Sequence, residues 1–183
     1  MNSETLVTKT IEESEDVSAL QIQAETKKVK ILIAASEGMP FVTTGGLGEV
    51  VGSLPKAIMK ENSEQFDVRV VLPLYESISI EDRQQMEFLG HFNVQLAWRQ
   101  QYCGVFRTTR NGVIYYFIDN EYYFKRANVY GHYDDGERFA FFSKAVLDSI
   151  TLMDFHPDII HCHDWQTALV PIYLNYVYGH LHA

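Results

Sequence analysis

The run Val29-Lys30-Ile31-Leu32-Ile33-Ala34-Ala35 is the clearest structural signal in the chain. It is a short, nearly continuous aliphatic run, which is typical of a strand covered on both faces in a parallel sheet. A loop containing Gly45-Gly46 follows, then a helical stretch from about 47 to 60 and a second aliphatic run at 68–72. Strand, helix and strand in this order predict a right-handed crossover unit.

The rest of the chain continues this α/β pattern. Three extended segments, the last two joined by the turn Arg110-Asn111-Gly112, predict a β-rich insertion on the sheet; they cover 88–98, 102–108 and 113–118. A helix with apolar residues at helical spacing, a strand and a further helix follow at 137–153, 157–163 and 165–176. We therefore predict an α/β fold with three layers, built on a Rossmann-like parallel sheet.

Two predictions concern helix boundaries. Pro55 lies inside the first helical stretch and predicts a kink or two abutting helices, with Ser53 capping the second. Before the helix at 137–153, Asp134 or Asp135 is expected to act as the N-terminal cap, with Glu137 in the first turn. The segment around these acidic residues is thus interpreted as mainly structural.

Composition excludes several classes of protein. Fifteen Lys and Arg against 24 Asp and Glu give a net charge of −9, which disfavours nucleic acid as a partner. No apolar run approaches the roughly 18 residues of a membrane helix, and the polar start lacks a secretory signal, so we expect a cytoplasmic protein without a membrane partner. Residues 1–28 are expected to form a flexible acidic leader, and Cys103 and Cys162 to be reduced thiols.

Ligands of open parallel sheets bind at the carboxyl ends of the strands, so the loop after Ala35 is one candidate site. Gly45, Gly46 and Gly48 stand at the entrance to a helix, where free amides and the helix dipole favour an anion such as a phosphate. Their spacing matches neither the GxGxxG fingerprint nor a P-loop. From the glycines alone, a ligand site and a merely tight strand-to-helix turn remain equally open.

The second candidate site is the end of the strand at 157–163. Alternation along a strand puts His161 and His163 on one face, but no third ligand follows at a suitable spacing. We therefore expect no metal and interpret the histidines as buried and hydrogen-bonded. Asp164 comes directly after the strand, where its carboxylate either caps the next helix or holds a substrate hydroxyl.

Taken together, these segments resemble the bacterial glycogen synthase and plant starch synthase family, whose members are retaining enzymes that use ADP-glucose. The stretch 33–56 is similar to the family's Ser-Glu, Pro, Lys-Thr-Gly-Gly-Leu-Gly-Asp-Val and Leu-Pro pattern. Residues 134–139 resemble its Asp-Asp-x-Glu-Arg-Phe segment, and 161–166 its His-x-His-Asp-Trp-Gln strand end. The resemblance implies that 29–183 form the N-terminal, acceptor-side half of a GT-B fold, truncated before a nucleotide-binding domain and inactive by itself.

The resemblance also implies roles for particular residues. Gly45 and Gly46 would supply amides near the phosphates of the donor, and Asp164 would be the catalytic carboxylate, which holds the glucosyl unit or stabilises its developing positive charge. Substrate-binding roles extend to further positions, which are Thr43, Glu49, His163 and Gln166. Glu49 replaces the family's usual aspartate, and Thr43 stands where the family usually has lysine, so a cation is missing near the donor.

The function implied is glycogen or starch synthesis, in which glucose passes from ADP-glucose to the non-reducing end of an α-1,4-glucan with retention. The expected partners are therefore ADP-glucose and a glucan, with no cofactor. Thr43 motivates an alternative, a noncatalytic glucan-binding or regulatory paralogue. A nicotinamide oxidoreductase is disfavoured, because the second strand ends in Val71-Leu72-Pro73-Leu74 without an acidic residue for a ribose.

Overall fold

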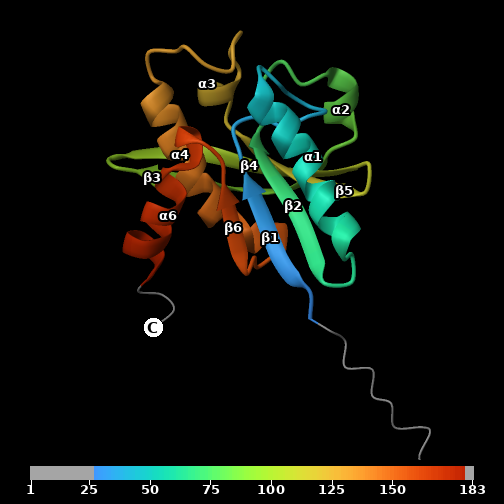
Figure 1. Cartoon of the computed structure of the whole chain (residues 1–183). Coiled ribbons are helices and arrows are strands. Elements are labelled where there is room, and N and C mark those ends of the chain that lie inside the picture. Colours follow the sequence, from blue (N-terminus) through green and yellow to red (C-terminus); the bar gives the residue numbers. More distant parts are fainter. Residues whose placement is uncertain (1–26, 180–183) are drawn as a thin grey trace, which may run out of the picture.

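The computed structural model describes residues 27–179, which form a six-stranded sheet with helices packed on it (Figure 1). The strands are β1 (Val29–Ala34), β2 (Phe66–Pro73), β3 (Glu87–Leu96), β4 (Arg99–Arg110), β5 (Val113–Asp119) and β6 (Ile159–Cys162). The helices are α1 (Gly46–Glu61), α2 (Ile80–Gln84), α3 (Glu121–Phe124), α4 (Asp135–Asp148), α5 (Ile150–Met153) and α6 (Leu169–Tyr173). Short helical turns, η1 (Trp165–Thr167) and η2 (Leu174–Tyr178), flank α6. Apart from Lys27 and Lys28, the predicted leader lies outside the described residues.

Strand β1 lies inside the sheet because β2 and β6 pair with it in parallel, one on each side. Its side chains alternate between two cores: Leu32 and Ala34 pack in the layer of α4, whereas Ile31 and Ile33 pack in the layer of α1. Burial on both faces explains why this strand is aliphatic at nearly every position. The predicted three-layer α/β fold is confirmed.

The segments predicted as an insertion belong to the same sheet, whose strand order is β3-β4-β5-β2-β1-β6. Strand β5 pairs in parallel with β2, while β4 and β3 extend the sheet by antiparallel pairing. The predicted turn at 110–112 joins β4 to β5, with positive φ angles at Asn111 and Gly112. The sheet is therefore parallel through β5, β2, β1 and β6, whereas β4 and β3 join it by antiparallel pairing at the opposite edge.

The prediction of two abutting helices around Pro55 is wrong, because α1 is one continuous helix. Ser53 is not an N-terminal cap. Its hydroxyl donates instead to the carbonyl oxygens of Glu49 at 2.9 Å and Val50 at 3.2 Å. A proline removes one backbone donor from a helix, and packing of α1 on the sheet, where Val51 and Pro55 are buried, holds the helix together despite that loss.

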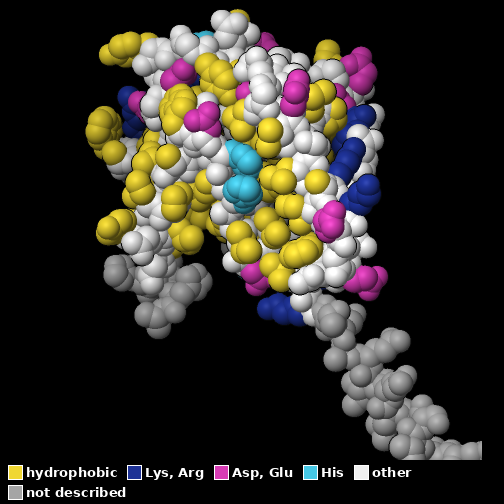
Figure 2. Space-filling model, viewed as in Figure 1, with side chains coloured by type: hydrophobic (Ala, Val, Ile, Leu, Met, Phe, Trp, Pro, Cys, Tyr) yellow, Lys and Arg dark blue, Asp and Glu magenta, His cyan; other side chains and the backbone are white. Residues whose placement is uncertain are grey.

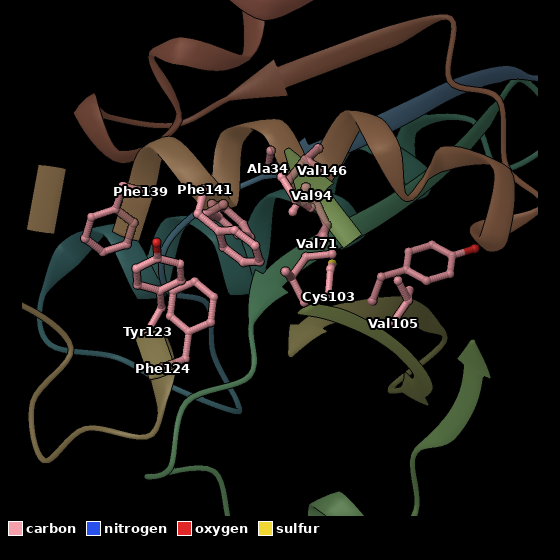
Figure 3. Close-up of a cluster of buried hydrophobic side chains, with 14 of the residues drawn as sticks. Ala34, Val71, Val94, Cys103, Val105, Tyr123, Phe124, Phe139, Phe141 and Val146 are labelled. Carbon is pink, nitrogen blue, oxygen red and sulfur yellow. The ribbon is translucent and has the colours of Figure 1, made fainter. Parts of the chain in front are cut away.

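The core between α4 and the sheet is rich in aromatic side chains (Figure 3). Phe141 of α4 lies 4.9 Å, centroid to centroid, from Tyr123, which α3 brings beneath it. The single helix predicted at 137–153 is interrupted at Ser149, whose hydroxyl donates to Val146 O at 2.9 Å. This bond satisfies a carbonyl where the chain turns from α4 into α5.

Strand β6 forms one edge of the described sheet, and it is less covered than β1. Figure 2 shows histidine side chains gathered on this face among hydrophobic ones. The helix predicted at 165–176 is divided among η1, α6 and η2. Within residues 27–179, no helix has the length and apolar character needed to cross a bilayer.

Candidate functional site

The two candidate loops meet at one edge of the sheet. Ala34 of β1 stands opposite Cys162 of β6, and the amide of His163 donates to Ala34 O at 3.0 Å. Because the strands are parallel, the residues that follow them leave the sheet side by side. The segment after β1 and the segment that begins with Asp164 therefore leave the sheet at the same edge.

Behind this edge lies a polar cluster that sequence reasoning left out of the site: Ser36, Glu37 and Tyr130. Ser36 and Glu37 are buried, the Glu37 carboxylate accepts a hydrogen bond from the amide of Thr44, and the hydroxyls of Ser36 and Tyr130 lie 2.7 Å apart. Burial, with Glu37 and Asp164 nearby, raises the pKa of Tyr130 to about 12. The position of Glu37 directly after a strand was the available signal, but its burial could not be read from the sequence.

The glycine loop contains two kinds of glycine. A Cβ on Gly48 would lie 2.5 Å from the Thr43 hydroxyl, and one on Gly52 would lie 2.7 Å from the Met39 Cβ, so these two glycines allow close packing within the chain. A Cβ on Gly45 or Gly46 would meet no described atom within 4 Å. The backbone there is open to a ligand, and Gly45 begins α1 without a side-chain cap, so the first amides of the helix are free to bind an anion.

Thr43 and Glu49 occupy different surroundings. The Thr43 hydroxyl donates to Gly45 O at 3.1 Å and so supports the bend itself. Glu49 is exposed and lines a hollow of about 280 Å³ together with Lys56 and Asn111. Among the predicted substrate-binding residues, the structure therefore keeps Thr43 in the glycine bend but directs Glu49 into a hollow that Asp164 does not line.

Asp164 has a backbone conformation that is rare for any residue but glycine, with φ 63° and ψ −179°. Its Oδ1 accepts a hydrogen bond from the amide of Trp165 at 2.7 Å, and its side chain is exposed at the strand end. Such strain, about 1–3 kcal/mol, persists only where the surroundings impose it, and it is concentrated at functional sites. Asp164 thus caps the turn that follows it with one oxygen, and its carboxylate is exposed at the end of β6.

His163 and Gln166 carry polar atoms that the described part of the chain does not satisfy. The Nε2 of His163 and the Oε1 of Gln166 are buried without a hydrogen-bond partner. Burial, and then His161, lower the pKa of His163, which keeps its ring neutral. Buried polar groups without partners are uncommon, and both of these lie beside Asp164, where a ligand could satisfy them.

The histidine prediction is partly wrong. His161 and His163 do share a face, with ring centroids 4.4 Å apart, but His161 is exposed and Nε2 of His163 has no partner in the described range. No set of three or more His, Cys, Asp or Glu side chains in residues 27–179 is arranged to hold a metal ion.

The capping prediction for α4 is partly wrong: Asp134 stands at the N-cap position and Glu137 in the first turn, as predicted, but the side-chain cap is missing. Asp134 makes no side-chain cap and pairs instead with Arg126 at 2.9 Å. Asp135 accepts from the amides of Gly131 and His132 at 2.8 and 3.2 Å, which orders the loop before the helix, and it pairs with the buried Arg138. The interpretation of this segment as mainly structural agrees with these contacts.

The edge therefore combines donors and acceptors in a defined arrangement. The amides at the start of α1 suit a negatively charged group, whereas Asp164, Gln166 and the neutral His163 suit hydroxyl groups. Such a set fits a ligand that carries both phosphate and sugar, approaching along the open backbone at Gly45 and Gly46.

Comparison with known proteins agrees with this chemistry. A family model described as the starch synthase catalytic domain matches residues 30–183. The chain is 53% identical over 150 residues to a glycogen synthase of Clostridium beijerinckii, covering 82% of this chain and 31% of that protein. A glycogen synthase of Geobacillus stearothermophilus is 51% identical over 152 residues, which is 83% of this chain and 31% of that one.

A solved structure is similar as well: the catalytic domain of starch synthase IV from Arabidopsis thaliana, bound to ADP and acarbose. Its TM-score is 0.75 at 29% sequence identity, and the match covers 85% of this chain and 32% of that chain. The chain thus spans about a third of the length of the curated relatives it matches. The family resemblance seen in the three sequence motifs is confirmed.

Proposed function

Since this chain belongs to the starch synthase catalytic domain family, we propose that the whole protein transfers glucose from ADP-glucose to the non-reducing end of an α-1,4-glucan with retention. The observation that carries this proposal is the edge shared by the open glycine bend and Asp164. Relatives named glycogen synthase support the glucan product. The ADP in the structure of starch synthase IV supports the donor, because ADP is the group that leaves when ADP-glucose gives up its sugar.

The proposed reaction breaks the bond between the anomeric carbon and the diphosphate, so negative charge grows on one side and positive charge on the other. We assign the negative side to the amides of Gly45 and Gly46 and to the positive end of α1. Asp164 would stabilise the positive sugar, and His163 and Gln166 would bind its hydroxyls. Both His163 Nε2 and Gln166 Oε1 are buried without partners in the described chain, and hydrogen bonds to sugar hydroxyls would satisfy them.

We propose that the transfer uses no metal or cofactor, since the uncapped amides at the start of α1 would bind the diphosphate. We keep the proposal of a cytoplasmic location. Cys103 and Cys162 are both free thiols, and cysteines stay reduced in that compartment.

A second candidate function rests on Thr43. Its hydroxyl is engaged with Gly45 O, and it brings no positive charge to the donor phosphates. A charge-assisted contact to phosphate is commonly worth about 1.5–3 kcal/mol, so its loss favours a noncatalytic, glucan-binding paralogue. Transfer of glucose by the intact protein would reject this alternative, whereas glycogen binding without transfer from any nucleotide sugar would support it.

The proposed function is tested by measuring incorporation of glucose from labelled ADP-glucose into glycogen by the intact protein and by its Asp164→Asn variant. We expect the substitution to lower turnover at least about a hundredfold, the scale of a lost electrostatic contact in the transition state. Asp158→Asn is the matched control, because Asp158 is also exposed and accepts one backbone amide, that of Lys30 at 2.8 Å, at the other end of β6. An Asp164→Asn variant as active as Asp158→Asn would reduce Asp164 to a cap.

A further inference from the structure

The glycine bend depends on residues outside it to stay in one conformation. Gly45 and Gly46 supply the amides assigned to the diphosphate, and glycine has more backbone freedom than any other residue. Two adjacent glycines would lose much of that freedom when a ligand binds, which weakens binding unless the amides are already aligned. The contacts that fix the bend therefore determine how well it binds an anion.

The bend is fastened at its base by Glu37. The carboxylate accepts a hydrogen bond from the amide of Thr44, which directly precedes Gly45. Between these two points the chain closes on itself, because the amide of Gly38 donates to Val42 O at 2.9 Å and the amide of Val42 donates back to Gly38 O at 3.2 Å. The position of the Glu37 carboxylate thus sets the position of the first glycine amide.

Tyr130 reaches this base from a distant segment. Its hydroxyl lies 2.7 Å from that of Ser36, which is fully buried and directly precedes Glu37. Burial raises the pKa of Tyr130 to about 12, and the negative charges of Glu37 and Asp164 act in the same direction. The hydroxyl therefore stays protonated and lies near both carboxylates.

The ring of Tyr130 packs toward the end of β6. Its centroid lies 6.0 Å from that of Phe139, and Phe139 lies 5.2 Å from Trp165 in an edge-to-face arrangement. Trp165 directly follows Asp164 and donates its amide to the carboxylate of that residue. One side chain thus connects the base of the glycine bend with the residues around Asp164.

The loop before α4 fixes Tyr130 from both sides. The buried Arg138 donates to the carbonyl of Val129 at 3.2 Å, and the carboxylate of Asp135 accepts from the amide of Gly131 at 2.8 Å. These bonds hold the residues directly before and after Tyr130. Gly131 has a φ of 88°, which a residue with a Cβ rarely adopts. The contacts that make this loop structural therefore also set the position of Tyr130.

We propose that Tyr130 is a positioning residue for the donor site: its hydroxyl fixes Ser36 and Glu37, which hold the glycine bend ready for the diphosphate. Without that hydroxyl, Ser36 loses its partner and the base of the bend is free to shift. Tyr130 acts in this way without touching the substrate. The identity of the ligand as a diphosphate rests on the proposed function, whereas the contacts of Tyr130 do not.

The test is isothermal titration calorimetry of the intact protein and its Tyr130→Phe variant, with ADP as the probe. We expect the Kd for ADP to rise about three- to tenfold, the range that one buried hydrogen bond accounts for. In glucose transfer, the KM for ADP-glucose should rise by a similar factor while the KM for glycogen stays unchanged. A merely structural tyrosine would lower the melting temperature without moving the Kd of the folded protein.

Tyr116→Phe is the matched control. The hydroxyl of Tyr116 is also buried and hydrogen-bonded, but it donates to Met153 O at 3.1 Å and so reaches α5 rather than the bend. Its removal should leave the Kd for ADP unchanged. Circular dichroism melting checks that the variants are folded, and Ser36→Ala, which removes the other hydroxyl, provides the same test if Tyr130→Phe does not fold.

A double-mutant cycle tests whether the two hydroxyls act together. Ser36→Ala should weaken ADP binding as much as Tyr130→Phe does, and the double variant should bind ADP at most about twofold more weakly than either single variant. The reason is that both changes remove the same hydrogen bond. Effects that multiply in the double variant would overturn the proposal, and so would an unchanged Kd in both single variants.

Transfer and binding together separate this proposal from the proposed function. Glucose transfer by the wild type, with equal ADP binding by wild type and Tyr130→Phe, would reject the role of Tyr130 and uphold the synthase function. ADP binding that depends on Tyr130, without transfer, would do the reverse. A wild-type protein that does not bind ADP would overturn the assignment of the bend to a diphosphate, and the role of Tyr130 with it.

Discussion

The segments 134–139 and 161–166 are equally polar in sequence but differ in what the fold does with their polar groups. In the first, Arg138 is fully buried and donates to Tyr123 O at 2.7 Å, Val129 O at 3.2 Å and the Asp135 carboxylate at 2.5 Å. Only its Nη2 is left without a partner in the described chain. This segment ties the loop before α4 to α3.

In the second segment, the polar groups remain available. Asp164 is exposed and strained, while buried atoms of His163 and Gln166 have no partner between residues 27 and 179. The residue types of a motif therefore do not reveal its role. The role follows from which of its polar groups are left without hydrogen-bond partners after folding. Changes in the first segment should therefore affect stability, and changes in the second should affect function.

The largest effect is expected for Arg138→Met, which should lower the free energy of unfolding by about 3–5 kcal/mol. The substitution leaves the Asp135 carboxylate and two carbonyls without the buried guanidinium. Urea denaturation followed by circular dichroism measures it. Arg107→Met is the control, because Arg107 pairs with Glu87 at the surface and should lose at most about 1 kcal/mol. Equal losses in the two variants would contradict the role assigned to Arg138.

The same contrast can be sharpened within the glycine loop. Gly48→Ala should lower the free energy of unfolding by about 1–3 kcal/mol, because the new Cβ would overlap Thr43. Gly46→Ala should raise the free energy of unfolding by at most about 1 kcal/mol. A Cβ at this position would meet no described atom within 4 Å, and alanine suits a helix better than glycine. Denaturation curves compare the two, and a destabilised Gly46→Ala variant would show that this bend is needed for folding rather than left open for a ligand.

Asp164→Gly should stabilise the fold by about 1 kcal/mol, although it removes a carboxylate. Relief of about 1–3 kcal/mol of backbone strain exceeds the roughly 0.5–1 kcal/mol that glycine adds to the entropy of the unfolded chain. Asp158→Gly, at a position without a positive φ, should instead be destabilising. Equal losses of stability in both variants would show that the positive φ of Asp164 does not destabilise the fold.

The smallest effect is a pH dependence. Because the pKa of His163 is lowered in the folded protein, the unfolded chain takes up that proton first as the pH falls. The stability associated with neutral His163 is complete above its ordinary pKa of 6.5 and is lost as the pH falls from there toward the lowered value. Urea denaturation should therefore show a larger loss in wild type than in His163→Gln between about pH 7.5 and about pH 5. Parallel curves would contradict the buried, neutral ring.

Most of the fold could be predicted because periodicity is a local property. The run at 29–35 and the turn at 110–112 identified strand and hairpin directly. The pairing of β5 with β2 could not be read in this way, because it joins segments whose contact depends on the whole sheet. For the same reason, the caps expected at Ser53 and Asp134 were wrong, since tertiary partners compete for the same side chains.

By itself, the sequence determined the α/β layering and the edge at which a ligand would bind, because both follow from apolar runs and the positions where they end. Which polar side chains at that edge are satisfied and which are left open followed only from the tertiary structure. Hydrogen bonding depends on distances between residues far apart in the chain, and a linear pattern contains no such distances.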